Sequence, residues 1–240
     1  MSIRLDRLLA NLGYGSRREV QGLVAAGAVN LDGAWVSDSS LRIEADSKLP
    51  ERLSIEGRPL DPPPPLTLIL HKPGGAVCSH NEPGRSVFDL LPWRWRRRSP
   101  PISTIGRLDV DTTGLLLLTD DGGLLHRVIS PRSHIAKRYL ARLSRPLTGD
   151  EAALFASGDL TLEGESKPLA PAFLEPLDAF RARLTITEGR YHQVRRMFAA
   201  AGNHVEALHR EAVGGLELPP ELAPGDWRVA TPAELAAVFR

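Results

Sequence analysis

The chain has 240 residues, of which 42% are hydrophobic and 25% are charged, and its formal net charge is +1. These values are typical of a globular protein with one large domain or two modest ones. The single cysteine, Cys78, excludes an internal disulfide and argues strongly against a thiolate zinc site.

The apolar runs of the sequence are short. The longest, LTLIL (66–70) and GLLLL (114–118), are far below the ~20 residues that span a bilayer. The first residues contain Arg4, Asp6 and Arg7 and lack the apolar core of a signal peptide. We therefore expect a soluble cytoplasmic protein without a membrane partner.

Three segments concentrate basic residues on this nearly neutral chain. Residues 126–145 contain six Lys or Arg and no acid, and residues 181–198 contain five arginines and one acid. WRWRRR (93–98) has four arginines interleaved with two tryptophans. Each cluster alone is explained by a solvated surface, but three together favour a polyanionic partner.

The first part of the chain predicts two helices and a hairpin. Apolar residues follow a helical spacing over 3–12, and Ser16 with Glu19 forms a capping box for a second helix, which ends at Gly27. The Asp-Gly pair at 32–33 separates two short apolar segments, which is a hairpin signal.

The sequence DPPPP (61–65) marks the clearest boundary. Consecutive prolines fit neither a helix nor a central strand, and they favour an extended, stiff spacer. We predict a small domain at 1–60, a proline-rich linker at 61–65 and a larger domain at 66–240.

The larger domain mixes strands and helices. Hydrophobic patterns, caps and glycine stops predict strands at 66–70, 114–119, 137–143, 182–187, 204–210 and 227–230, and helices at 122–130, 149–156, 191–201 and 231–239. This mixture predicts an α+β fold with a large, mostly antiparallel mixed sheet flanked by helices.

The segment GRLDVDTTGLLLLTDDGG (106–123) places four aspartates around a run of leucines. The spacing from Asp109 to Asp120 is similar to that of a calcium loop, so a calcium-binding module is one interpretation. That loop requires a glutamate at its last position and an oxygen donor where Leu117 stands, and LLLLT is typical of a buried strand. We therefore keep calcium binding only as a distant alternative.

The same segment resembles the signature of pseudouridine synthases, GRLD followed by DTTGL. The stretches LHKPGGAVCS, SPRSHIAKRYL and TEGRYHQVRRMFAAAGNHVEALHREAVGG also resemble this family, in the same order. RLDRLL, GYGSRREV and GAVNLDG, near the start, resemble the S4 RNA-binding domain. GRYHQVRRMFAAAGNHV and LHRE look most like the RsuA-type branch, whose substrate is the 16S rRNA of the small ribosomal subunit.

The resemblance implies roles for three residues. Asp109 would be the essential carboxylate, acting either as nucleophile or as base on the ribose-uracil unit. Arg195 would lie against Asp109 as its cationic partner, and Tyr139 would stack on uracil and assist removal of the C5 proton. No metal and no redox cofactor is required by this chemistry.

The resemblance also implies a set of RNA contacts. Arg107 would support the loop or fill the gap that the extruded base leaves, and Lys72 would contact phosphate unless it is only a surface lysine of a Pro-Gly-Gly turn. The expected RNA-binding residues are Arg107, Arg4, Arg7, Arg17, Arg18, Lys72, Lys137, Arg190, His192, Gln193 and Arg196.

The remaining aspartates of the loop are expected to be structural. Asp111, with Thr112 and Thr113, would bond the amides of its own loop, while Asp120 and Asp121 would form the turn and the cap of the next helix.

The expected activity is the isomerisation of one uridine of 16S rRNA, uridine 516 in this branch, in a partly assembled small subunit. We expect the protein to act as a monomer. Two alternatives stay open: a synthase acting on 23S rRNA, and a non-catalytic RNA-binding protein of ribosome assembly.

Overall fold

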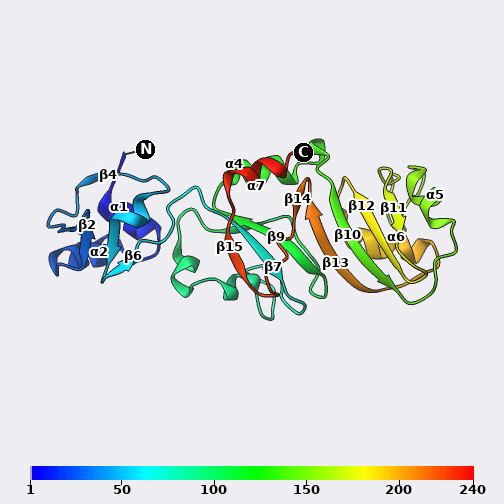
Figure 1. The fold of residues 1–240 in the computed structure, drawn as a ribbon, viewed down its shortest axis with the longest axis horizontal. Coiled ribbons are helices and arrows are strands. Elements are labelled where there is room, and N and C mark those ends of the chain that lie inside the picture. Colours follow the sequence, from blue (N-terminus) through cyan, green and yellow to red (C-terminus); the bar gives the residue numbers. More distant parts are fainter. Residues whose placement is uncertain (1) are drawn as a thin grey trace. The chain divides into compact units, whose positions relative to one another are not determined.

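The computed structural model describes residues 2–240, which divide into two compact units (Figure 1). The first unit runs to Thr67 and also takes up Leu91–Ser103 and Leu118–Gly122. The second contains Leu68–Leu90, Thr104–Leu117 and Gly123–Arg240. The domain limits at 60 and 65 stay a prediction. Among residues 2–240, no helix has the length and apolar character needed to cross a bilayer.

The first unit begins with the two expected helices. Its elements are β1 (Ser2–Arg4), α1 (Leu5–Asn11), α2 (Arg17–Ala25), β2 (Val29–Leu31), β3 (Ala34–Trp35), β4 (Arg42–Glu44), α3 (Leu49–Arg52), β5 (Leu53–Ile55) and β6 (Arg58–Pro59). The predicted capping box of α2 is present between Ser16 and Glu19. β2 and β3 pair antiparallel around Asp32 and Gly33, which confirms the predicted hairpin. Leucines and valines from both helices and from these strands form one buried core.

Part of the basic stretch WRWRRR is folded and buried, so the stretch as a whole is not a solvated loop. Trp93–Arg97 forms a short 3-10 helix, η2, with Trp95 buried, and the Arg94 guanidinium is ion-paired with Asp61 of the DPPPP stretch. Arg98 donates to the Pro62 carbonyl at 2.9 Å. The prolines are therefore held by arginines and do not form a free spacer.

Arg98 and Asp120 form a buried ion pair, with 3.1 Å between Nη2 and the carboxylate and side chains that are 1% and 0% exposed. Asp120 also accepts the amide proton of Leu66 at 2.7 Å. Both carboxylate oxygens of Asp120 are thus bonded to partners remote in sequence, and its expected role in the turn and cap of the next helix stays a prediction. The bond between Leu66 and Asp120 joins the start of the strand Thr67–Lys72 to the end of the strand Thr113–Thr119.

The second unit is built on a nine-stranded mixed sheet, in the order β11-β12-β10-β13-β9-β7-β15, with β14 on β13 and β8 on β9 (Figure 1). The strands are β7 (Thr67–Lys72), β8 (Ser103–Ile105), β9 (Thr113–Thr119), β10 (Lys137–Leu143), β11 (Phe173–Pro176), β12 (Arg181–Ile186), β13 (Val205–Val213), β14 (Leu216–Glu217) and β15 (Trp227–Val229). β10, β11, β12 and β13 pair antiparallel, whereas β13 and β9 pair parallel. The predicted fold class is confirmed.

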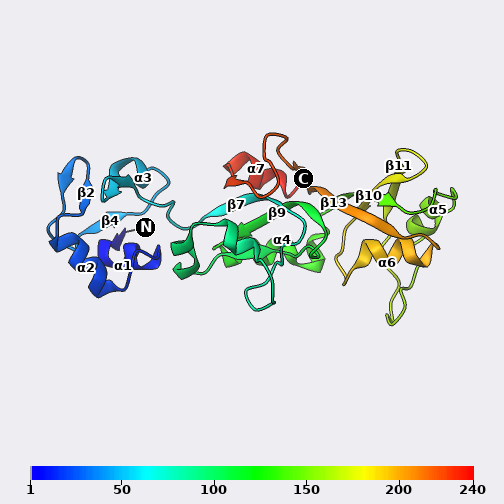
Figure 2. The same ribbon diagram turned by 90° about the horizontal axis from the view of Figure 1, so that it is seen from below.

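Helices cover the sheet at the expected places in the chain. They are α4 (Gly122–Ile129), α5 (Glu151–Ala156), α6 (Gln193–Ala200) and α7 (Pro232–Ala237), with short 3-10 turns η1 (Val87–Leu90) and η3 (Pro131–Ser133). Figure 2 shows α6 along one face of the sheet, beside β10 and β13. Apolar residues of α4 pack with those of β9 in one core, which gives the loop before β9 a rigid base.

Candidate active site

The second unit contains a cavity of about 1230 Å³. Its walls come from the loop between β8 and β9, from β10, from the segment that leads into α6, and from β13. The structure brings Asp109, Tyr139 and Arg195 together here. Five of the expected RNA-binding residues line the same cavity: Arg107, Lys137, Arg190, His192 and Gln193.

Asp109 lies in the loop before β9 and its side chain is 32% exposed. One carboxylate oxygen is 3.3 Å from Nε2 of His192, and the other is 3.8 Å from Nε of Arg195. Arg195 is itself held in place, because its Nη1 donates to the Val205 carbonyl at 2.9 Å. The carboxylate thus faces a fixed guanidinium and an imidazole while it remains open to the cavity.

Lys72 anchors this loop. The ammonium group is fully buried and donates to the carbonyls of Pro73, Val110 and Thr112 at 2.9–3.0 Å. Burial lowers the pKa of Lys72, and the nearby carboxylates of Asp111 and Asp109 act against that shift. Lys72 is therefore not a surface lysine of a Pro-Gly-Gly turn, because its three protons are donated to carbonyls inside the protein, and its contact with phosphate stays a prediction.

The side chains of the loop do not hold it together as expected. Oγ1 of Thr113 is 2.8 Å from Nδ1 of His209 in β13, and the buried Oγ1 of Thr112 has no partner among residues 2–240. Asp111 is exposed. The expected Asx- and Ser/Thr-type turns are therefore wrong, and the loop is shaped by Lys72 and by a backbone bond from the Thr112 amide to the Asp109 carbonyl.

Tyr139 is a central residue of β10 and is 8% exposed. It stands opposite Leu184 of β12 and opposite Arg210 of β13, and its neighbour Lys137 lines the cavity as well. Burial, followed by the charge of Arg210, lowers the pKa of Lys137. The aromatic ring thus lies in a rigid wall beside one buried cation, Arg210, and one half-buried cation, Lys137.

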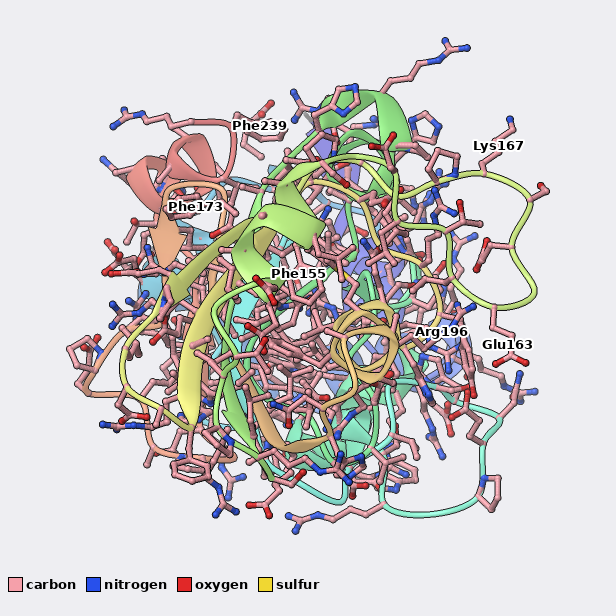
Figure 3. All side chains as sticks on the ribbon, turned by 90° about the vertical axis from the view of Figure 1, so that its right-hand side faces the viewer. Phe155, Glu163, Lys167, Phe173, Arg196 and Phe239 are labelled. Carbon is pink, nitrogen blue, oxygen red and sulfur yellow. The ribbon has the colours of Figure 1, made fainter. Side chains whose placement is uncertain are left out.

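The segment before α6 is tied to the loop before β11. Arg196 bonds Glu165 at 3.0 Å and the Glu163 carbonyl at 2.6 Å (Figure 3). Arg190 bonds Glu165 and the carbonyls of residues 167 and 168. Both arginines therefore have protein partners, and their contact with RNA stays a prediction.

Two further residues of this segment shape the cavity wall. The Gln193 side chain is buried and accepts the Arg190 amide proton. His192 adopts a left-handed backbone conformation, with φ 48°, and its ring stacks on exposed Tyr191 with 3.8 Å between the ring centroids. This turn presents His192 to Asp109.

The other predicted RNA contacts lie on the surface. Arg107 is exposed and pairs with Glu82 at 2.6 Å. In the first unit, Arg7 and Arg18 are exposed, while Arg4 and Arg17 both pair with buried Asp6 at 3.0 Å. The hydrogen bond from Arg4 lowers the pKa of Asp6 most. The hydrogen bond from Arg17 lowers it further, so this pKa stays well below its usual range although the carboxylate is buried.

The calcium-like spacing does not form a metal site in the described chain. Residues 2–240 contain no group of three or more His, Cys, Asp or Glu side chains that could hold an ion. β9 begins at Thr113, in the middle of the spacing, and Asp120 at its end is bonded to Arg98.

Neither the burial of Lys72 nor any role for Arg210 was predicted from the sequence. Lys72 was expected either to contact phosphate or to lie at the surface of a Pro-Gly-Gly turn, and Arg210 of the LHRE motif received no role. Lys72 follows a short apolar strand pattern, and Arg210 lies in an alternating one. Neither pattern predicts that a cation is buried.

Comparison with known proteins identifies the family. Residues 67–200 match the model of the RNA pseudouridylate synthase family, and residues 3–48 match that of the S4 domain. The chain is 43% identical to ribosomal small subunit pseudouridine synthase A of Escherichia coli (strain K12), over 98% of this chain and 100% of the relative. It is 41% identical to the uncharacterized RNA pseudouridine synthase YtzG of Bacillus subtilis (strain 168), over 97% of each.

A solved structure supports the same assignment. A crystal structure of a pseudouridylate synthase, 37% identical, covers 98% of this chain and 99% of its own, with a TM-score of 0.69. The chain therefore belongs to the RNA pseudouridylate synthase family, in the RsuA-type branch that carries an N-terminal S4 domain, and it is an RNA pseudouridine synthase.

Proposed function

We propose that this enzyme converts one uridine of 16S rRNA, uridine 516, to pseudouridine, with Asp109 as the catalytic carboxylate. The observation that supports this most is the grouping of Asp109, Arg195 and Tyr139 around one cavity. The relatives named for the ribosomal small subunit, aligned over the whole chain, support 16S rRNA over 23S rRNA.

The chemistry needs no external reactant. Asp109 either attacks C1′ of the ribose or removes its C2′ proton, and the bond from C1′ to N1 of uracil breaks. The ring turns and C5 bonds to C1′. On the first route the bond from C1′ to the Asp109 oxygen breaks in this step, and on the second route C2′ regains its proton from Asp109. C5 then loses its proton, and N1 gains one. Arg195 keeps its charge beside the Asp109 carboxylate, and Tyr139 packs against the ring and assists proton removal from C5.

The target base must leave its stack before it can enter the cavity. Extrusion costs a few kcal/mol, which contacts to the flanking RNA must offset. Exposed arginines are available in both units, among them Arg107 at the rim of the cavity and Arg7 and Arg18 on the S4 domain. We infer that the enzyme acts as a monomer on a partly assembled small subunit in the cytoplasm, where the target is still accessible.

Mapping of pseudouridines in rRNA tests the proposal. Cells that lack this protein should lose one pseudouridine of 16S rRNA, and expression of the protein should restore it. Loss of a 23S rRNA site instead would identify the alternative substrate. Unchanged maps of both rRNAs would contradict an rRNA-modifying role.

A further inference from the structure

The cavity holds a buried cation to which the chemistry above gives no role. Arg210 of β13 is 4% exposed and is one of the lining residues. Its Nε donates to the Leu115 carbonyl at 2.7 Å, but the fully buried Nη2 has no acceptor among residues 2–240. Leaving a buried donor unpaired is unfavourable, and a guanidinium has five N–H groups to satisfy. The unpaired end of Arg210 therefore indicates a ligand that enters the cavity.

The sheet places Arg210 beside the aromatic wall. Arg210 stands directly opposite Tyr139 in the antiparallel pair of β13 and β10. Opposed residues of such a pair project from the same face, with Cβ atoms about 5 Å apart. A uracil packed on the Tyr139 ring therefore turns one edge of its own ring, where its carbonyl oxygens lie, toward the guanidinium.

A close approach of β9 fixes this position. Gly114 pairs with Arg210 in the parallel contact of β9 and β13, and a Cβ at Gly114 would lie 2.3 Å from the Arg210 carbonyl oxygen. β9 follows directly on the loop that carries Asp109. The same strand contact thus sets the positions of Asp109 and Arg210 relative to each other.

The charge around Arg210 suits an anion. Lys137 lines the same cavity, and the charge of Arg210 is one of the causes that lower the pKa of Lys137, after burial. Fixed cations in a cavity that is partly closed to water stabilise negative charge that develops during a reaction.

We propose that Arg210 donates a hydrogen bond to a carbonyl oxygen of the extruded uracil and stabilises the negative charge that this ring gains during catalysis. The inference rests on the function proposed above. When the bond from C1′ to N1 breaks, the electron pair stays on uracil and spreads over its two carbonyl oxygens. When C5 has bonded to C1′, the proton that C5 loses and the proton that N1 gains leave the ring neutral, so the charge that Arg210 stabilises is transient.

Sulfur substitution in the substrate tests this role. We would measure single-turnover isomerisation of a 16S rRNA fragment with uridine, 2-thiouridine or 4-thiouridine at the target position. The proteins are the wild type, Arg210→Gln and a matched control, Arg138→Gln. Arg138 is next to Tyr139 in β10 but does not line the cavity, and it pairs with Glu211 and Glu217.

With uridine, Arg210→Gln should react about 100-fold more slowly at saturating enzyme, because one donor to developing charge is lost. RNA binding should change little. At one of the two carbonyl positions, sulfur should slow the wild type and Arg138→Gln but have much less effect on Arg210→Gln. Sulfur is a poor acceptor, and the shorter, uncharged glutamine lacks the charge-assisted bond that sulfur would weaken.

Equal effects of sulfur in all three proteins would overturn the proposal, as would a wild-type rate for Arg210→Gln. If Arg210→Gln does not fold, Arg210→Lys keeps the charge and is measured in the same way, with its thermal unfolding as the check. A wild-type enzyme that does not convert the unmodified uridine fragment would instead contradict the proposed function itself.

Discussion

A single buried lysine holds the loop that carries Asp109. Lys72 is the fully buried anchor of residues 110–112, and it donates to carbonyls on both sides of Asp111. Hydrogen bonds from a buried charge are stronger than those of exposed side chains, so they make this loop more rigid. The geometry around Asp109 therefore depends on a residue whose three protons are all donated to carbonyls inside the protein.

Lys72→Met tests this role. Methionine keeps the apolar stem and removes the donors, which leaves three buried carbonyls short of a partner at about 1–3 kcal/mol each. We expect a clear drop in melting temperature and at least a tenfold loss of kcat, measured by thermal unfolding and by pseudouridine formation. Lys167→Met is the control, because Lys167 is exposed (Figure 3). Similar behaviour of the two variants would show that Lys72 does not anchor the loop.

The candidate active site depends on the pairing of two strands, β9 and β13. Gly114 has φ +108°, and an added Cβ would meet the Arg210 carbonyl oxygen at 2.3 Å. Gly114→Ala must therefore separate the two strands or distort the loop before them, at a cost of a few kcal/mol.

We expect Gly114→Ala to lower the melting temperature by several degrees and to lose most activity. Gly122→Ala is its control, since a Cβ there meets nothing within 4 Å. An active, stable Gly114→Ala protein would mean that the strands approach less closely than described.

Long elements with a clear pattern could be predicted from the sequence. β9, β10, β12 and α6 all form within one or two residues of the expected bounds, and β13 extends three residues beyond its expected end. The short strands were missed, because two to four residues carry too little periodicity, and their pairing is decided by neighbours distant in sequence.

Only those residues of the site that lie in recognisable family motifs were predicted from the sequence. Asp109, Tyr139 and Arg195 come together as expected, since each lies in a segment that resembles the family. Buried cations were not predicted. Arg98 stands in a basic stretch typical of a surface, and Lys72 stands where an apolar strand meets a Pro-Gly-Gly turn. The contacts that bury them, with Asp120 and with the loop carbonyls, are tertiary.

For the whole molecule, we expect RNA binding to depend on arginines of the S4 domain. Arg7 lies on α1 and Arg18 on α2, and both side chains are exposed. The double variant Arg7→Ala/Arg18→Ala should raise KM and keep kcat, because these residues are in the S4 domain while the cavity lies in the other unit. Its RNA binding should also depend less steeply on salt. The slope of log binding constant against log salt concentration should become shallower by about 0.7–0.9 for each lost phosphate contact.

The control for this prediction is Arg42→Ala/Arg58→Ala, which changes two exposed arginines on strands of the same unit. Binding titrations of both double variants at several salt concentrations compare the two surfaces. The helical surface is not the RNA contact if both variants bind equally well at every salt concentration.

We propose that Asp109 carries out the isomerisation of a uridine in small-subunit rRNA. The most direct test of this central claim is single-turnover pseudouridine formation on 16S rRNA by Asp109→Asn, measured together with RNA affinity. Asparagine keeps the size of the side chain and removes the charge that faces Arg195. We predict no detectable product and an affinity within severalfold of the wild type. Turnover by Asp109→Asn at a rate near that of the wild type would contradict the mechanism.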